Sequence, residues 1–284
     1  MSGAGGSHYG VAISYPSSIR DYNGGDYNGF MAHIKSLGAS VIRTDYSAGA
    51  GTAFETAYKA ALANGLSVVP ILIFKTADTV SSVQVKAADL AARYPGVKTV
   101  ELGNEPNGSW SWGAAPNPEA YTALAKAAAA ILRSTLPGVK LISPGLAEYG
   151  VNDSTHMMPA DFERREIAAG LDVDCWGYHP YSDWAWTTQM PVVHQTLLNA
   201  GITEPLCLTE TGRDTLNFTE AQQASAVTAR IADARKLDWI DDLYWYAGQD
   251  RNSASTSSRE DRFGLFHTNW TEKPAAQAYR DALR

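Results

Sequence analysis

The sequence predicts an α/β protein that folds as a single (β/α)8 barrel without an added β-sandwich. A short run of β-branched or aromatic residues, followed by an alanine-rich amphipathic stretch, recurs about every 30 to 40 residues. No linker interrupts this alternation, which is typical of a parallel sheet. The 284 residues are close to the ~250 of a typical (β/α)8 barrel. One domain covering residues 1–284 is therefore expected.

The predicted strands are short segments that are rich in apolar residues and end at turn-forming or polar residues. In chain order they cover Val11–Tyr15, Val41–Tyr46, Ser67–Phe74, Thr99–Glu105, Lys140–Pro144, Val173–Tyr181, Leu206–Glu210 and Leu243–Trp245. Eight strands match a closed barrel better than an open doubly wound sheet. The open sheet would also need a dinucleotide fingerprint, and the segment starting at Gly49-Ala50-Gly51 reaches Phe54 where the third glycine should stand.

Helix start and stop signals fill the gaps between these strands. Thr52 and Thr219 are each followed, three residues later, by a glutamate or glutamine, which is the spacing of a capping box. Asn117-Pro118 combines an N-cap residue with proline at the first helical position. The predicted helix exits are Asn64-Gly65, Pro137-Gly138 and Ala200-Gly201. These signals lie where a strand–helix repeat requires them.

Composition and charge exclude several classes of function. The formal charge is −7 and we find no basic stripe, so nucleic acid and anionic membranes are poor partners. No apolar run is long enough to span a membrane. Neither Cys175 nor Cys207 belongs to a disulfide-rich pattern, and both are expected to be free, buried thiols in neighbouring strands. The histidines show no metal-ligand spacing, so no metal and no cofactor are expected.

Two glutamates end predicted strands on the edge where a barrel carries its active site. Glu105 closes the fourth strand, and Glu210 closes the seventh, on the same face as Leu206 and Leu208. A ring of eight strands with ordinary spacing and tilt leaves about 6 Å between the two carboxyl groups. That separation is nearer to the ~5–5.5 Å of retaining glycosidases than to most of the range of inverting ones.

The chain resembles glycoside hydrolase clan A along essentially its whole length. The resemblance is carried by Asn104-Glu105-Pro106, Glu210, Tyr178-His179-Pro180-Tyr181, Arg43 and Trp245. Single features are similar to the heparanase-like, the xylosidase and iduronidase, or the cellulase-like family, so the family within the clan stays open. The resemblance implies a retaining double displacement in which Glu105 is the general acid/base and Glu210 is the nucleophile. It also implies that Asn104 bonds the 2-hydroxyl of the sugar.

Arg43 is expected to hold Glu210 in its ionised form, together with a tyrosine of the sixth strand. An alternative to the contact with Glu210 is that Arg43 pairs with Glu101. An alternative to a binding role for His179 is that it is a core histidine. Tryptophans follow strands four, six and eight, where flat aromatic faces suit sugar rings. Asn107 is a polar neighbour that can bond sugar hydroxyls. The expected substrate-binding residues are Arg43, Asn104, Tyr178, His179, Tyr181, Trp110, Trp112, Trp184, Trp186 and Trp245.

These features together predict an endo-acting hydrolase of a β-linked poly- or oligosaccharide that works as a monomer. Such a substrate implies extracellular or cell-envelope action, although Met1–Gly6 lacks the features of a signal peptide. The alternative is a carbohydrate-binding barrel without turnover, because fold and aromatic residues alone would also suit that role. The presence of both Glu105 and Glu210 favours the enzyme.

Overall fold

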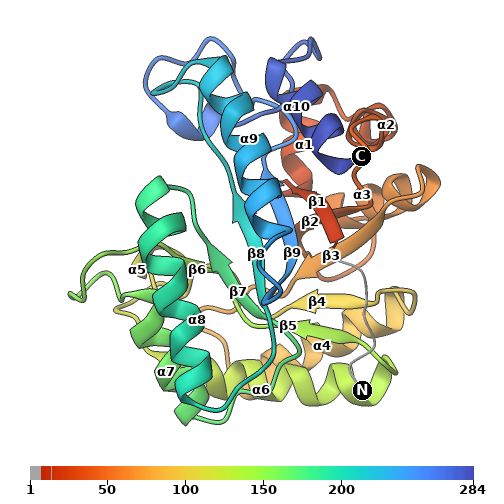
Figure 1. Cartoon of the computed structure of the whole chain (residues 1–284). Helices are drawn as coiled ribbons and strands as arrows, with labels where there is room; N and C mark the ends of the chain where they lie inside the picture. The colour runs from red at the N-terminus through yellow and green to blue at the C-terminus, as the bar shows by residue number, and fades with distance from the viewer. Residues whose placement is uncertain (1–7, 14) are drawn as a thin grey trace. The chain divides into compact units, whose positions relative to one another are not determined.

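The computed structural model describes residues 8–13 and 15–284, and strands alternate with helices along this chain (Figure 1). The opening segment Met1–Gly6, and Ser14 of the first predicted strand, lie outside the described residues. Every strand pairing that is described is parallel. This element order is the one expected of a (β/α)8 barrel.

Each predicted strand overlaps an observed one. The strands are β1 (His8–Ala12), β2 (Val41–Asp45), β3 (Ser67–Ile71), β4 (Thr99–Glu101), β5 (Lys140–Ile142), β6 (Leu146–Ala147), β7 (Trp176–His179), β8 (Leu206–Thr211) and β9 (Ile240–Tyr246). The predicted fifth strand overlaps β5, and the short strand β6 that follows it was not predicted. Pro144 lies between them, and its lack of an amide hydrogen interrupts the ladder.

The helices begin and end close to the predicted signals. They are α1 (Pro16–Asn23), α2 (Tyr27–Ser36), α3 (Ala53–Ala63), α4 (Val80–Arg93), α5 (Ser109–Trp112), α6 (Pro118–Thr135), α7 (Pro159–Ala168), the π-helix η1 (Ala185–Gln189), α8 (Met190–Asn199), α9 (Glu220–Ala234), the 3-10 helix η2 (Arg259–Asp261) and α10 (Pro274–Leu283). Thr219 and Gln222 form the predicted capping box on α9. Thr52 and Asn117 cap α3 and α6 by accepting hydrogen bonds from backbone amides.

The described chain divides into two compact units. The first unit holds the described residues up to Thr44 together with residues 51–68 and 209–284, and the second holds residues 45–50 and 69–208. In the first unit β1 lies between β2 and β9, with Val11 opposite both Ile42 and Trp245. Helices α9 and α10, drawn in blue in Figure 1, pack against each other. The Tyr279 hydroxyl of α10 donates to the carbonyl oxygen of Gly10 at 2.9 Å, which ties this helix to β1.

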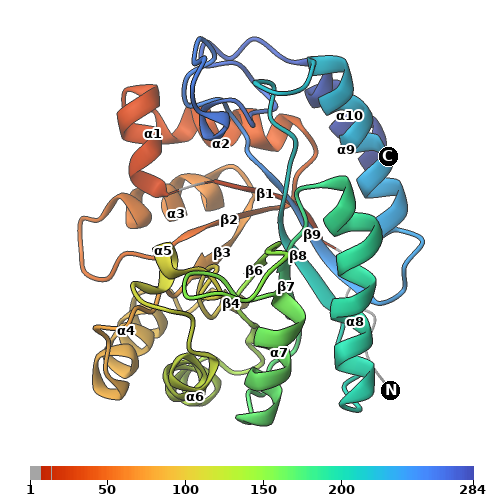
Figure 2. The ribbon, with the colours of Figure 1, turned by 90° about the vertical axis from the view of Figure 1, so that its left-hand side faces the viewer.

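In the second unit β4 lies between β3 and β5, and β7 lies between β6 and β8. A parallel bridge between Ile142 and Cys175 connects these two groups of strands. Helices α4, α6 and α7 lie side by side in that order, as Figure 2 shows. Neighbouring strands are thus followed by neighbouring helices, which is the local arrangement that βαβ units produce.

The prediction that Cys175 and Cys207 are free thiols is wrong. The two residues form a disulfide, with their Cα atoms 5.8 Å apart. The sequence correctly placed them at neighbouring strands, and this pairing of β7 with β8 brings the two Cα atoms within the usual disulfide range of 4.4–6.8 Å.

Among the described residues, none of the helices is long and apolar enough to cross a membrane.

Candidate active site

Arg43 and Glu210 form an ion pair in the first unit. Arg43 lies on β2, Glu210 lies next to the last residue of β8, and their Nη1 and Oε1 atoms are 2.5 Å apart. Arg43 is 1% exposed, whereas Glu210 is 14% exposed. A guanidinium stays charged at any ordinary pH, so this contact favours the ionised carboxylate. The structure thus confirms the predicted contact between these two side chains.

Glu105 and His179 form a corresponding pair in the second unit. His179 is the last residue of β7 and is fully buried, and its Nδ1 atom lies 2.7 Å from Oε1 of Glu105. Glutamate and histidine side chains can also bind metal ions, but the distance between these Nδ1 and Oε1 atoms is that of a direct hydrogen bond. Glu105 therefore has an imidazole as its hydrogen-bond partner, in place of a permanently charged group.

The backbone of Glu105 is left-handed, with a φ of 47°. In the described part of the chain, Trp270 is the other non-glycine residue with a positive φ. Such a conformation costs of order 1–3 kcal/mol and is found at functional sites that the surrounding structure over-determines. Here the Glu105 amide donates to the carbonyl oxygen of Gly145 at 2.9 Å, which holds the residue in place.

Asn107 braces the segment that carries Glu105. Its side chain is fully buried, accepts a hydrogen bond from the Ala147 amide at 2.9 Å, and donates to the carbonyl oxygens of Ala147 and Met157. The expectation that Asn107 bonds sugar hydroxyls is therefore wrong, because backbone groups of the protein occupy its amide. Asn104 forms a parallel bridge with Gly145, and its carbonyl oxygen accepts a hydrogen bond from the Ser111 hydroxyl.

The segment after β7 is held by buried polar contacts. Tyr178 is fully buried, and its hydroxyl donates to Oε1 of Gln189 at 2.6 Å. Burial, with the nearby Glu148 and Glu163 carboxylates, raises the pKa of Tyr178 far above its ordinary value. The amide of Tyr181 donates to Oε2 of Glu148 at 2.7 Å. Tyr178 is thus part of the support of this segment, whereas Tyr181 keeps partial exposure.

The predicted tryptophans fall into two groups. Trp110 is 63% exposed and Trp184 is 46% exposed, so both have rings that a ligand can contact. The other three, Trp112, Trp186 and Trp245, are buried. Trp112 packs edge-on against the ring of Tyr121, with the centroids 5.6 Å apart. Burial of these three rings counts against a role in stacking on sugar.

Tyr149 is a candidate site residue that the sequence did not predict. Its hydroxyl accepts a hydrogen bond from Nε1 of the exposed Trp110 at 2.9 Å, and Gln189 donates to its carbonyl oxygen. Burial, and in smaller part the charge of Glu105, raises the pKa of Tyr149. Tyr149 follows the predicted fifth strand, so its place after a strand was the signal that could have found it.

Comparisons with known proteins identify the fold. A scan with protein-family models finds no match, and a search of curated protein sequences finds none either. Among solved structures, the chain is similar to a family 39 glycoside hydrolase from Bacteroides cellulosilyticus, with a TM-score of 0.72 and 18% identity. That similarity covers 97% of this chain and 63% of the Bacteroides chain, so this chain spans less than two thirds of that relative.

Two further structures belong to other glycoside hydrolase families. A family 5, subfamily 18 protein from Streptomyces cattleya, solved with GlcNAc, has a TM-score of 0.71 and 18% identity over 98% of this chain and 80% of its own. A family 128 endo-β-1,3-glucanase from Amycolatopsis mediterranei, solved with laminarihexaose, has a TM-score of 0.59 and 21% identity over 97% and 99%. All three families belong to clan A. The predicted fold is confirmed: the chain has the (β/α)8 barrel fold of clan A glycoside hydrolases.

Proposed function

We propose that the protein is a retaining glycoside hydrolase in which Glu105 is the general acid/base and Glu210 is the nucleophile. The observation that carries this proposal is the difference between the partners of the two carboxyl groups. Glu210 contacts a buried, permanently charged guanidinium, whereas Glu105 is hydrogen-bonded to an imidazole. A nucleophile has to be ionised, and the permanently charged partner that favours this form lies beside Glu210, which supports the assignment of the nucleophile to Glu210 and of the acid/base to Glu105.

The proposed reaction has two steps. In the first, a Glu210 oxygen attacks the anomeric carbon, the glycosidic C–O bond breaks, and the proton of Glu105 moves to the leaving oxygen. In the second, Glu105 takes a proton from water, the water oxygen bonds to the anomeric carbon, and the bond to Glu210 breaks. Two inversions give net retention. His179 holds the Glu105 carboxyl in place through both steps, and Arg43 does the same for Glu210.

We propose an endo-acting enzyme for a β-linked poly- or oligosaccharide. The exposed rings of Trp110 and Trp184 support this, because flat aromatic faces stack on pyranose rings. The Amycolatopsis structure, an endo-β-1,3-glucanase with bound laminarihexaose, gives further support at the level of the fold. Asn104, Tyr149 and Tyr181 are proposed to contact sugar hydroxyls. We further propose that the chain works as a single domain and as a monomer.

The proposal is tested by reducing-sugar release from a panel of polysaccharides, with wild type and Glu210→Ala compared on each. Release from one polymer that disappears in a mutant with an unchanged circular dichroism spectrum supports the proposal. A matched pair then separates the roles on aryl glycosides. Glu105→Gln is expected to retain much more activity on an activated aryl glycoside than on the polymer, whereas Glu210→Gln loses both.

Two results would contradict the proposal. Equal losses in Glu105→Gln and Glu210→Gln on both substrate types would show that the roles are assigned wrongly. Saccharide binding with no release from any polymer, and with unchanged affinity in both mutants, would identify a binding barrel without turnover. The anomeric configuration of the first product, read by proton NMR before mutarotation, tests retention separately.

A further inference from the structure

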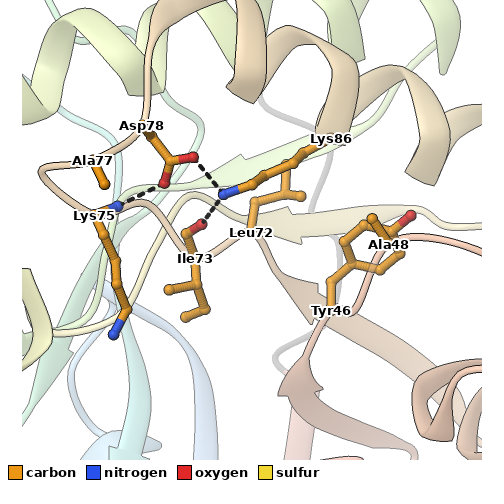
Figure 3. A pocket seen from close by; sticks show the side chains of 8 residues that line it. All are labelled: Tyr46, Ala48, Leu72, Ile73, Lys75, Ala77, Asp78 and Lys86. Atoms are coloured by element: carbon orange, nitrogen blue, oxygen red, sulfur yellow. Dashed lines mark hydrogen bonds and ion pairs between the residues drawn. The ribbon is translucent and has the colours of Figure 1, made fainter.

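A pocket of about 330 Å³ lies in the second unit, beside the segments that follow β2 and β3. Its lining consists of Tyr46, Ala48, Leu72, Ile73, Lys75, Ala77, Asp78 and Lys86, which are drawn in Figure 3. In a barrel the carboxyl ends of the strands carry the active site, so this pocket lies at the functional end of β3.

The pocket is next to the segment that carries Glu105. Strand β3 pairs with β4, and the Leu72 amide donates to the carbonyl oxygen of Glu101 at 2.9 Å. Further along, the Thr76 amide donates to the carbonyl oxygen of Trp112 at 3.0 Å. The 72–76 segment is therefore hydrogen-bonded to both ends of the 101–112 segment. The pocket and Glu105 therefore belong to neighbouring strand-to-helix segments.

The acidic residue of the pocket is fully occupied by protein groups. Asp78 Oδ1 accepts from Lys86 Nζ at 2.7 Å and from the Ser82 hydroxyl at 2.9 Å, and Asp78 Oδ2 accepts from the Lys75 amide at 2.9 Å. Lys86 Nζ also lies 3.3 Å from the carbonyl oxygen of Ile73. The charges of Asp78 and Lys86 thus cancel, and both side chains shape the loop.

Lys75 supplies a positive charge that no described residue neutralises. Its side chain is exposed and extends away from the Asp78–Lys86 ion pair, as Figure 3 shows. Within the described part of the chain, no carboxylate lies within ion-pair distance of its ammonium group. The pocket therefore carries one net positive charge in a protein whose formal charge is −7. A local charge of this kind favours an anionic group on the ligand.

The rest of the lining is apolar and suits a sugar ring. Leu72, Ile73, Ala48 and Ala77 present aliphatic groups, and the Tyr46 hydroxyl is turned to Asp89, to which it donates a hydrogen bond. The volume is at the lower end of the ~300–1,000 Å³ typical of small-molecule sites. It therefore matches a single monosaccharide unit better than a longer segment.

We propose that this pocket binds an anionic sugar unit, whose carboxylate or sulfate contacts Lys75, so that the substrate is an acidic polysaccharide. This inference rests on the proposed function, because it assigns a substrate class to the same enzyme. Lys75 acts in binding and takes no part in bond cleavage. Its replacement is therefore expected to raise KM for the acidic polymer and to leave kcat unchanged.

The test uses isothermal titration calorimetry in the inactive Glu210→Ala background. The probes are a β-1,4-linked uronic acid hexamer, the same hexamer with its carboxyl groups reduced to alcohols, and a sulfated neutral hexamer. Adding Lys75→Gln is expected to weaken binding of an anionic hexamer about tenfold and to leave the reduced hexamer unaffected. Binding of the uronic acid hexamer identifies the anionic group as a carboxylate, and binding of the sulfated hexamer identifies it as a sulfate.

Lys98→Gln is the matched control, because Lys98 is also exposed but precedes β4 at its amino end. An equal effect of Lys98→Gln, an equal affinity for the uronic acid hexamer and its reduced form, or no binding of any probe overturns the proposal. Hydrolysis is scored separately in wild type. Cleavage of a neutral polymer without any effect of Lys75→Gln rejects the pocket and retains the hydrolase. Binding that depends on Lys75 without cleavage of any polymer rejects the hydrolase and retains the pocket.

Discussion

Arg43 donates a hydrogen bond from Nη1 to Oε1 of Glu210 at 2.5 Å, and the donor is buried while the acceptor keeps some exposure. The two residues come from β2 and β8 of the first unit, and 167 residues separate them in the sequence. A buried guanidinium has few alternative positions, so it fixes where the carboxylate lies as well as its charge.

Replacing Arg43 by methionine is expected to lower kcat at least 100-fold, because the Glu210 carboxylate loses both its charge partner and its fixed position. The free energy of unfolding should fall by about 3 kcal/mol, the lower end for breaking a buried ion pair. Arg164→Met, which removes an exposed partner of Asp161, should change neither quantity appreciably. Kinetics on an aryl glycoside and urea denaturation measure the two effects. Wild-type kcat in Arg43→Met would remove Arg43 from the proposed mechanism.

Replacing Gly103 by alanine is expected to damage both stability and activity. Gly103 has a φ of 113°, and a Cβ atom there would lie 2.0 Å from the Tyr121 hydroxyl oxygen. Gly138→Ala is the matched control, since Gly138 has a φ of 73° with nothing within 4 Å of such a Cβ. It should cost about 1 kcal/mol, from backbone strain alone, whereas Gly103→Ala should cost at least twice as much.

The clash at Gly103 should also displace the segment that leads to Glu105 and lower kcat. Adding Tyr121→Phe removes the clashing oxygen and is expected to restore part of the loss, although the strain from positive φ remains. Thermal denaturation and kcat of the single and double variants test this. Identical costs for Gly103→Ala and Gly138→Ala would show that the contact with Tyr121 has no energetic effect.

Loss of the disulfide is expected to lower the free energy of unfolding by about 3–4 kcal/mol, given the 32-residue separation of Cys175 and Cys207. The double serine variant, measured by urea denaturation beside wild type, gives this value. Dithiothreitol should destabilise wild type and leave the double variant unchanged. Two reactive thiols in the denatured, unreduced wild-type protein would show that the bond does not form.

Glu163 and Glu166, both buried on α7, should make the protein less stable as pH rises. Burial raises the pKa of each well above the ordinary 4.5, and for Glu163 the charge of Glu166 adds to the effect. The folded protein then holds protons that the unfolded chain releases above about pH 4.5. Stability is therefore complete below that pH and falls by up to about 1.4 kcal/mol per pH unit for each group as pH rises toward the folded pKa.

Glu166→Gln should flatten this decline, so the variant should match wild type near pH 4 and exceed it at pH 7. Urea denaturation between pH 4 and pH 8 measures the curves. Glu119→Gln is the control, because the exposed Glu119 has a lowered pKa beside Arg165 and should show no such gain. Parallel curves for wild type and Glu166→Gln would mean that Glu166 is already ionised in the folded protein.

Local patterns in the sequence predicted the strands and helices of the fold. The capping box at Thr219 and the N-cap at Asn117 depend on residues within one turn, so the sequence shows them directly. Strand alternation predicted that Glu105 and Glu210 end their strands. Glu210 is next to the last residue of β8, whereas β4 ends at Glu101 and Glu105 lies beyond it. Arg43 was paired with Glu210 because both were expected to face inward.

Features that depend on contacts between distant segments were not predictable in this way. Asn107 is a polar residue in a loop, and only its neighbours Ala147 and Met157 reveal that it is buried. The disulfide depends on a 5.8 Å Cα separation that strand order alone does not give. The buried tryptophans have the same local sequence character as the exposed ones, because burial depends on what packs over each ring.

The left-handed backbone at Glu105 creates a conflict between the stability of the folded chain and the proposed catalysis at one position. Asparagine and glycine adopt a φ near 47° with less strain than glutamate does, so either would make the folded chain more robust while removing the proposed proton donor. A laboratory selection for heat resistance alone would therefore favour asparagine or glycine at this position, and such variants would lack the proposed proton donor. Selection for the proposed catalysis would retain the strain, and any engineered stabilisation of this protein has to be sought elsewhere in the chain.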